Sequence, residues 1–284
     1  MILKTGPAPH WFCDPSFGQS GGEFHQRYIT AKPFPHIVLD DFMDEELANS
    51  CLREFPQRLS SLREYARSQE NKKLEYNPET LSPSLRSLFY TFNSVPFIRF
   101  LQNLTGIHGL IPDPYFAGGG LHEVANGGHL SIHADFNHHI EMDLERRINL
   151  LIYLNRDWKE EYGGCFEIWD PGMNECSLRV APLFNRCVVF STSSTSFHGN
   201  PEPVNHPEGA SRRSIALYYY TATWDKFRKE RSTQFKVRPG SADQFDFAIR
   251  FEEIAAEITP PIAMRAFRKL IDSVRRRRAA NIYG

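Results

Sequence analysis

The sequence contains few cysteines, and they are scattered. Only five occur among 284 residues, at positions 13, 51, 165, 176 and 187, and no two of them form a CxxC pair. This argues against a structural zinc site, for which closely spaced cysteine pairs are typical. An odd number of scattered thiols fits reduced cysteines in a cytoplasmic protein.

Long hydrophobic runs and a strong net charge are also absent. No apolar stretch approaches the roughly 20 residues that a transmembrane helix needs, and the first residues lack the basic-then-apolar pattern of a secretory signal. The formal net charge is -1, which gives no electrostatic support for nucleic-acid binding. We therefore expect a cytoplasmic protein that binds neither membrane nor nucleic acid. The oligomeric state is left open.

The length and the hydrophobic content of 41% suit one large domain or at most two. No internal repeat or low-complexity linker divides the chain. We predict a single domain over 1–284 in three parts: an N-terminal arm with supporting helices over 1–110, a β core over 111–224, and C-terminal helices over 225–284.

The N-terminal part carries mixed signals. Residues 1–35 are rich in glycine, proline and aromatics without a clear period, which predicts an extended arm over the core. A short strand is expected over 34–42, followed by a helix whose first turn holds the acids of 44–46. A second helix is expected over 96–104, with Gly106 as its end. Residues 60–75 are polar and charged, which predicts either helix or loop.

From about residue 110, runs of β-branched and aromatic residues alternate with turns. Strands are expected at 113–124, 129–134, 147–154, 164–170, 177–180, 186–192 and 212–221. Many short strands separated by polar turns indicate a sandwich or barrel. In the strand over 147–154, Ile148, Leu150 and Ile152 share one face, which we expect to pack on helices outside the sheet. Asn149 and Tyr153 share the other face.

The triplet His133-Ala134-Asp135, with His198 far downstream, is the main chemical signal. Alternation in a strand places His133 and Asp135 on one face, and His198 would come from a distant strand that faces the same interior. Two imidazoles and one carboxylate can hold one face of an Fe(II) ion and leave the opposite face open. We predict these three residues as the metal ligands and the catalytic centre.

A second signal follows His198 in the segment Arg212-Arg213-Ser214. Alternation points Arg212 and Ser214 to the same side and Arg213 to the other. A fixed cation beside a hydroxyl, one strand from a metal, suits the far carboxylate of a dicarboxylic co-substrate. We prefer Arg212 to Arg213 for this role.

Other interpretations of the metal signal remain open. A zinc hydrolase would also accept two histidines and one aspartate, with Glu123 or Glu167 as a candidate base, but it does not explain Arg212 and Ser214. His122, His129, His138 and His139 lie near the triplet in the sequence and could contact substrate or orient a ligand. His138 follows the strand, which argues against it as a ligand.

Five sequence elements occur in order between about Tyr115 and Trp224. They are Gly127-Gly128 followed by His133-x-Asp135, the strand Asn149–Asn155, Gly163-Gly164 before a strand that ends with Trp169-Asp170, His198-Gly199, and Arg212-x-Ser214. Together they resemble the 2-oxoglutarate- and Fe(II)-dependent dioxygenases, specifically the prolyl 4-hydroxylase-like branch. The flanks, 1–110 and 225–284, match less sharply.

The resemblance implies a mainly-β fold with flanking helices, the double-stranded β-helix or distorted jelly roll. It implies that His133, Asp135 and His198 bind Fe(II). It also implies that the 5-carboxylate of 2-oxoglutarate pairs with Arg212, assisted by Ser214 and the phenol of Tyr153. The expected reaction is O2-dependent hydroxylation of an unactivated C–H bond, with succinate and CO2 as co-products.

The substrate is not identified by the sequence. A small molecule and a peptidyl side chain both remain candidates, and fold-level analogy is a weak guide. Asn126, Phe136 and Asn137 lie close to the metal signal in the sequence and are candidate substrate contacts. The alternative to an active hydroxylase is a non-catalytic metal-binding jelly roll that acts as a sensor or interaction protein. Loss of a ligand would favour that alternative, and none is lost.

Overall fold

The computed structural model describes residues 16–56, 63–66, 69–222 and 231–241. These residues all lie in the first of two compact units, Met1–Asp243. Of the C-terminal segment 225–284, the described part is 231–241, which contains the short strand β13 (Gln234–Phe235); the helices expected there lie outside the described residues. The single domain expected over 1–284 stays a prediction.

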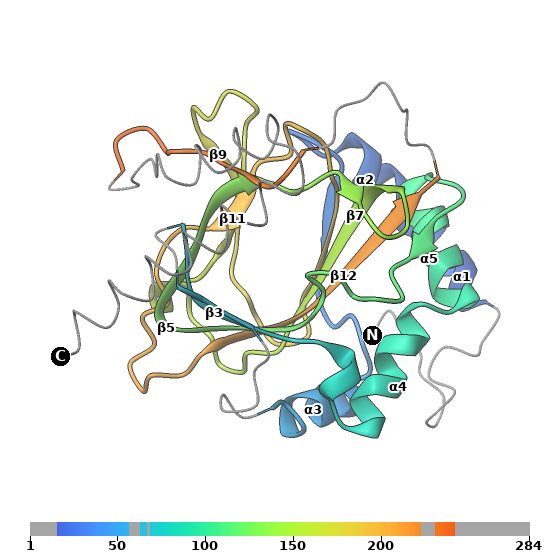
Figure 1. Ribbon diagram of the computed structural model, residues 1–284, viewed down its shortest axis with the longest axis horizontal. Helices are drawn as coiled ribbons and strands as arrows, with labels where there is room; N and C mark the ends of the chain where they lie inside the picture. The colour runs from blue at the N-terminus through green and yellow to red at the C-terminus, as the bar shows by residue number, and fades with distance from the viewer. Residues whose placement is uncertain (1–15, 57–62, 67–68, 223–230, 242–284) are drawn as a thin grey trace, which may run out of the picture. The chain divides into compact units, whose positions relative to one another are not determined.

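Thirteen described strands form one antiparallel sheet that curls back on itself (Figure 1). Apart from β13, they are β1 (His36–Leu39), β2 (Arg63–Ala66), β3 (Glu70–Tyr76), β4 (Ile111–Pro112), β5 (Gly120–Ala134), β6 (His138–His139), β7 (Leu144–Tyr153), β8 (Phe166–Trp169), β9 (Cys176–Val180), β10 (Cys187–Ser191), β11 (His198–Asn200) and β12 (Arg212–Thr221). The main path runs β1-β10-β7-β12-β5-β11-β8-β9.

The long strand β5 connects two halves of this sheet, one that contains β7 and β12 and one that contains β11 and β8. Its first part pairs with β12 on one side and β3 on the other, and its last part pairs with β11, where His133 lies opposite His198. The bend between them contains Gly127, at φ 79°, and Gly128, where an added Cβ would lie 2.7 Å from the Asn71 carbonyl oxygen. Glycine is therefore required at this turn. The predicted mainly-β jelly roll, a double-stranded β-helix with flanking helices, is confirmed.

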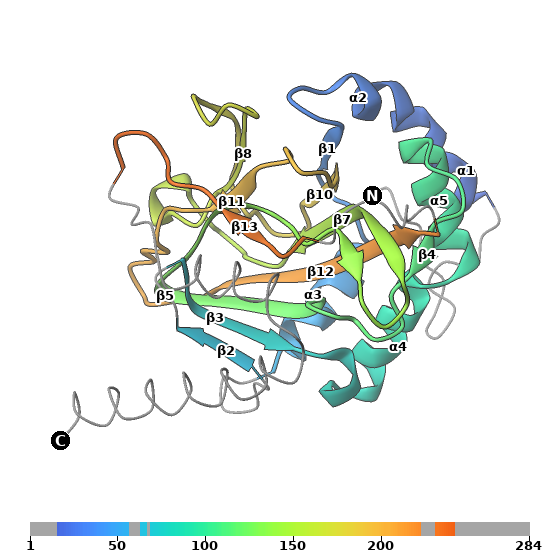
Figure 2. The same ribbon diagram turned by 45° about the horizontal axis from the view of Figure 1, so that its top comes forward.

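Helices cover the outer face of the β7–β12 half of the sheet (Figure 2). The helical segments are α1 (Phe17–Ser20), η1 (Gly21–Phe24), α2 (His25–Thr30), α3 (Glu45–Arg53), η3 (Pro78–Thr80), α4 (Pro83–Phe92), α5 (Val95–Thr105) and η4 (Glu160–Tyr162). None in the described part of the chain is long and apolar enough to cross a lipid bilayer.

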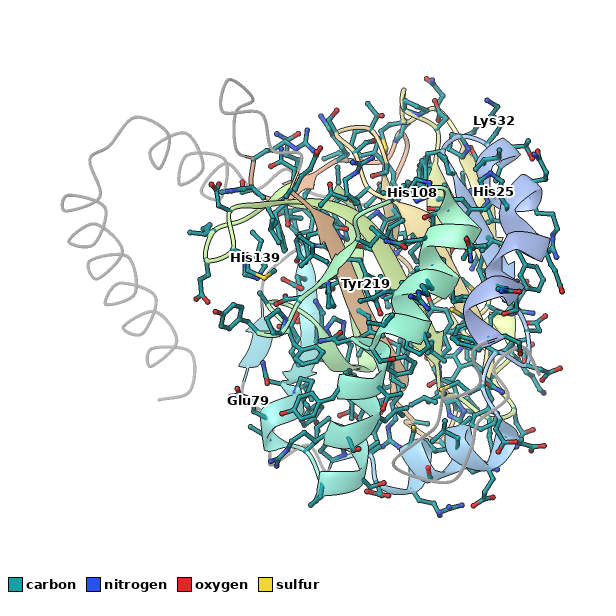
Figure 3. The ribbon with its side chains drawn as sticks, turned by 90° about the vertical axis from the view of Figure 1, so that its right-hand side faces the viewer. His25, Lys32, Glu79, His108, His139 and Tyr219 are labelled. Carbon is teal, nitrogen blue, oxygen red and sulfur yellow. The ribbon has the colours of Figure 1, made fainter. Side chains whose placement is uncertain are left out.

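Helix α5 shows why the sequence folds this way. Its apolar residues Phe97, Phe100, Leu101 and Leu104 recur at helical spacing and are fully buried. Gly106 ends the helix in the left-handed conformation at φ 73°, as the sequence predicted. On the sheet side, Tyr219 of β12 points outward, and its ring lies 6.3 Å from that of Phe97 (Figure 3).

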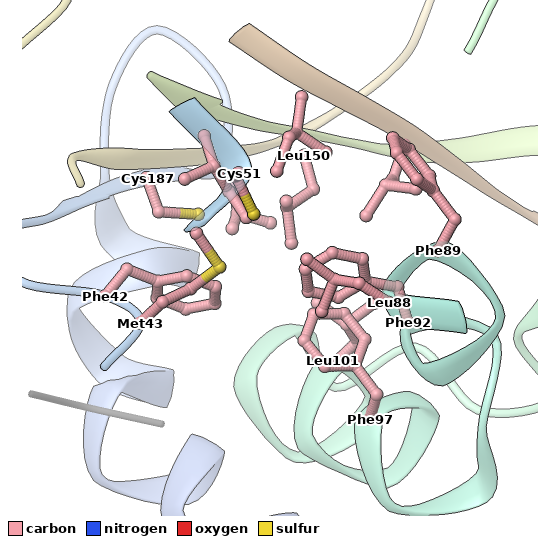
Figure 4. Packing of buried hydrophobic residues seen from close by; sticks show 14 of the residues in the cluster. Phe42, Met43, Cys51, Leu88, Phe89, Phe92, Phe97, Leu101, Leu150 and Cys187 are labelled. Carbon is pink, nitrogen blue, oxygen red and sulfur yellow. The ribbon is translucent and has the colours of Figure 1, made fainter. Parts of the chain in front are cut away.

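The main core lies between these helices and the sheet (Figure 4). Ile148, Leu150 and Ile152 of β7 are fully buried in it, so the prediction that this face packs on helices is confirmed. Each such side chain contributes about 1.5–3 kcal/mol on burial. The core thereby fixes the outer face of β7, and Asn149 and Tyr153 lie on its inner face.

Two predictions for the N-terminal part are wrong. Residues 17–30 form α1, η1 and α2 rather than an extended arm; Phe17 of α1 stacks on Phe100 of α5, so tertiary packing supports helices too short to be stable alone. Residues 63–66 and 70–76 form the hairpin β2–β3 rather than helix or loop. The sequence also left α4 unassigned, although Ser82 caps its first turn through the Leu85 amide and Pro83 begins it.

Candidate functional site

The structure brings His133, Asp135 and His198 together. One ligand atom from each lies within 4.8 Å of the others. His133 and Asp135 come from the end of β5, and His198 begins β11, which pairs with β5 at this point. Gly199 permits this approach, because an added Cβ would lie 2.8 Å from the carbonyl oxygens of Leu130 and Ser131. Within the described residues this is the one such cluster of histidine, cysteine and acidic side chains.

Backbone carbonyls fix the orientation of both imidazoles in the same way. His133 Nδ1 lies 2.8 Å from the Ser131 carbonyl oxygen, and His198 Nδ1 lies 2.9 Å from that of Ser196. A carbonyl only accepts, so each Nδ1 carries a proton, and in the neutral imidazole each Nε2 keeps a lone pair. The two Nε2 atoms face Asp135, at 3.6 Å from Oδ1 and 3.3 Å from Oδ2. Such an arrangement is typical of metal-binding histidines.

Asp135 is held by two further side chains. Asn149 Nδ2 donates to Oδ2 at 2.6 Å, and Arg146 Nη2 lies 3.3 Å from the same oxygen. Burial opposes ionisation of this carboxyl, but the Arg146 charge holds the pKa of Asp135 well below its usual value. Burial lowers the pKa of His198, and Asp135 opposes that shift. The site therefore presents a carboxylate and a neutral imidazole, the forms that bind a cation.

Arg146 is fully enclosed. Its guanidinium lies 3.6 Å from the centre of the Tyr218 ring and 4.4 Å from that of Phe136, and its Nε donates to Asn149 Oδ1 at 2.9 Å. Sequence reasoning missed Arg146 because alternation from Asn149 points Arg147 inward. A register irregularity opposite Tyr219 and Tyr220 inserts one extra residue into β7 and turns Arg146 to the inner face instead.

A second polar site lies on the inner face of the sheet. Arg212 is 5% exposed, and its Nε donates to the Gly164 carbonyl oxygen at 2.7 Å. Its Nη2 donates to the Tyr153 hydroxyl at 3.2 Å, and Ser214 lies opposite Tyr153 in the β12–β7 register. In the described part of the chain, no acidic side chain forms an ion pair with Arg212. A buried cation without a counter-charge is costly, so this site fits an anionic group from a ligand.

Arg213 has the surroundings expected for the opposite face. Its guanidinium lies over the Phe55 ring at 4.8 Å, and its Nε lies 3.7 Å from Glu123. Arg212 is thus the one of this pair that reaches the inner face.

Next to Ser214, a row of polar side chains continues across the sheet. His122 of β5 lies opposite both Ser214 of β12 and Glu75 of β3. Glu75 Oε1 is 2.8 Å from Lys73 Nζ and 3.8 Å from His122 Nε2. All three side chains are at most 12% exposed. This row was not predicted from the sequence, because β3 was not expected as a strand.

The row predicts a pH-dependent stability. Burial, and then the charge of Lys73, lower the pKa of His122 from 6.5 to about 4, with Arg212 adding to the effect and Glu75 opposing it. Between these two values the unfolded chain binds a proton at His122 that the folded chain does not bind. Stability should therefore fall as the pH decreases from about 6.5 to 4, by about 3 kcal/mol in full. Urea unfolding of His122→Gln at several pH values should show a flatter profile than wild type; identical slopes would contradict this.

The three predicted substrate contacts have different surroundings. Phe136 follows Asp135 and covers Arg146. Asn137 binds the backbone of Arg231, whose amide donates to its Oδ1 at 2.8 Å. Asn126 lies at the bend of β5, where its Oδ1 accepts from the His206 amide.

The competing histidines and carboxylates have other partners. His138 lies 2.9 Å from Asp143 and His139 3.4 Å from Asp113. Glu123 accepts from the Tyr76 hydroxyl, and Glu167 accepts from Trp169 Nε1. Neither carboxylate is placed in the metal cluster.

Comparison with known proteins gives matches of three kinds. Residues 119–220 match the model of the 2OG-Fe(II) oxygenase superfamily, a range that contains the three clustered residues and Arg212. The chain is 25% identical over 223 residues to prolyl 3-hydroxylase OGFOD1 of Xenopus laevis. That match covers 74% of this chain and 39% of the relative, so the chain spans about two fifths of the length of that relative.

Two solved structures share the fold. The first is a prolyl hydroxylase from Trichoplax adhaerens in complex with a peptide fragment of the hypoxia inducible factor oxygen degradation domain, with a TM-score of 0.52, 14% identity, and coverage of 72% of this chain and 90% of that one. The second is a prolyl 4-hydroxylase from Phytophthora capsici, with a TM-score of 0.50, 20% identity, and coverage of 74% and 66%.

Proposed function

We propose that this oxygenase of the 2-oxoglutarate- and Fe(II)-dependent superfamily hydroxylates an unactivated C–H bond at the site formed by His133, Asp135 and His198. The substrate, 2-oxoglutarate and O2 would give the hydroxylated product, succinate and CO2. The family match and the prolyl-hydroxylase-like fold bear out the prediction of an enzyme of this class.

His133 Nε2, His198 Nε2 and Asp135 would hold the metal. The donor set fits Fe(II), because two neutral imidazoles and one carboxylate are the ligands of the non-haem iron oxygenases. Bound iron would supply the activation of O2. Arg146 and Asn149 both engage Asp135 Oδ2, so they would orient the carboxylate that holds the metal.

The observation that carries the proposal is Arg212 on the inner face of the same sheet, a buried cation with no acidic partner among the described residues. A guanidinium meets a carboxylate with two charge-assisted hydrogen bonds, and Ser214 and the Tyr153 hydroxyl add further polar contacts beside it. Together they would bind the 5-carboxylate of 2-oxoglutarate and orient the molecule toward the metal. A zinc hydrolase has no need of this anion site.

The substrate would be a small molecule or a peptidyl side chain. The name of the curated relative, a prolyl 3-hydroxylase, supports a prolyl substrate. Asn126, Phe136 and Asn137 remain our proposed substrate contacts, and Phe136, which directly follows Asp135, has the most direct position. A cytoplasmic location is proposed from the cysteines: Cys51, Cys165, Cys176 and Cys187 are all free thiols, as expected in a reducing compartment.

Anaerobic addition of Fe(II) and 2-oxoglutarate tests the proposal. The purified protein should develop a visible metal-to-ligand charge-transfer band, and admission of O2 with a substrate library should release succinate. Addition of Fe(II) with succinate in place of 2-oxoglutarate is the control and should give no band. Absence of the band in wild type would favour the non-catalytic sensor or interaction protein.

A further inference from the structure

We infer that residues 231–241, which we call the strap, position the three proposed metal ligands. The positioning residues are Phe235, which belongs to the strap, and Asn137, which binds the strap from the segment after β5. The inference rests on the proposed function. The strap lies outside the range of the family match, 119–220, and its strand β13 runs along the β5–β11 half of the sheet (Figure 2).

The first contact is with the strand that carries His133. In β13, Gln234 lies opposite Ala134, and Phe235 lies opposite His133. The Lys236 amide extends this pairing by donating to the Ile132 carbonyl oxygen at 2.8 Å. The strap is therefore joined to β5 by backbone hydrogen bonds at the position of the ligand itself.

Phe235 also contacts the His133 side chain. The two ring centres lie 5.4 Å apart, and the His198 ring lies 4.6 Å from His133. The imidazole of His133 thus contacts the rings of both His198 and Phe235. The hydrogen bond from Nδ1 to Ser131 restrains one end of the ring, and the Phe235 contact restrains its face. Both restraints hold Nε2 toward Asp135.

The other two ligands are reached through their neighbours. Asn137 lies two residues after Asp135. Its side-chain Oδ1 accepts from the Arg231 backbone amide at 2.8 Å, and its backbone amide donates to the Arg231 carbonyl oxygen at 3.3 Å. At the other end, the Lys236 ammonium lies 5.7 Å from the centre of the Phe197 ring, and Phe197 precedes His198. One short segment therefore contacts all three ligand-bearing segments.

These contacts have a defined physical consequence. Residues that orient metal ligands commonly change metal affinity by about 10- to 100-fold when they are removed. Without Phe235, His133 could rotate away from the metal between rebinding events, so dissociation should become faster. Without the Asn137 side chain, the strap loses one of its two hydrogen bonds beside Asp135, and the same effect should follow to a smaller extent.

The rate of metal release measures the effect of Phe235 and Asn137 on the metal site and requires no turnover. The protein is loaded anaerobically with Co(II), whose visible absorption reports the ligand geometry, and a chelator is added in excess. Phe235→Ala should release Co(II) about 10- to 100-fold faster than wild type with an altered Co(II) spectrum, and Asn137→Ala should release it several-fold faster. Phe235→Leu, which keeps most of the volume, should restore most of the retention.

The control is Val237→Ala, in the same strap but 42% exposed, which should release Co(II) at the wild-type rate. Circular dichroism confirms that each variant is folded. Equal release rates and spectra in wild type and the folded Phe235→Ala and Asn137→Ala variants would overturn the strap inference alone. A wild-type protein that retains no Co(II) would instead contradict the proposed function.

Discussion

Replacement of His133 or His198 with alanine should abolish metal binding and all 2-oxoglutarate turnover. Each variant removes one of three ligand atoms that lie within 4.8 Å of one another. Each also removes one of the two imidazoles that face Asp135. Since partners that only orient ligands already contribute about 10- to 100-fold, the loss of a direct ligand should exceed 100-fold in metal affinity. Anaerobic titration with Fe(II) and 2-oxoglutarate should show no charge-transfer band.

His138→Ala is the matched control, because His138 lies in the same region of the sequence but pairs with Asp143 at 2.9 Å. It should bind Fe(II) like wild type. The assignment of the ligands would be wrong if His138→Ala lost the metal while His133→Ala, still folded by circular dichroism, kept it.

Replacement of Arg212 with methionine should raise the KM for 2-oxoglutarate about 100-fold, while kcat at saturation changes much less. A hydrogen bond to a charged group contributes about 1.5–3 kcal/mol, and Arg212 offers more than one donor to a carboxylate. The variant also removes a buried charge that has no acidic partner in the described residues, so the free energy of unfolding should not fall by the amount expected for a broken buried ion pair. Initial rates of succinate formation against 2-oxoglutarate concentration give both constants.

Arg213→Met is the control on the same strand. Its side chain is 35% exposed and lies beside Glu123, so its removal should alter stability by at most about 1 kcal/mol and leave the KM unchanged. A larger rise in KM for Arg213→Met than for Arg212→Met would reverse the assignment of the anion site.

Alternation and spacing predicted most of the β core. β7, β10 and β12 lie within a few residues of their expected ranges, because each has β-branched or apolar residues that pack on the helical core. The same alternation predicted that Arg212 and Arg213 face opposite sides of the sheet, and their contacts with Tyr153 and Phe55 agree with this. Where one face of a strand is apolar, its register is visible in the sequence.

The missed parts have one physical cause in common. β3 contributes Lys73 and Glu75 to a polar inner face, where they pair with each other, so no apolar period marks it as a strand. Arg146 reaches Asp135 only because an extra residue in β7 shifts the alternation. Both features depend on contacts between segments far apart in the chain, which a local pattern does not contain.

Backbone pairing around His133 limits how a substrate can be recognised. β11 occupies one edge of this part of β5, while the start of β3 and then β13 occupy the other. An extended peptide therefore finds no vacant edge of this strand, within the described residues, to which it could add as a further strand. Selectivity among substrates at the metal would then depend on side chains, and grafting a main-chain recognition motif onto this edge would first require β13 to be displaced.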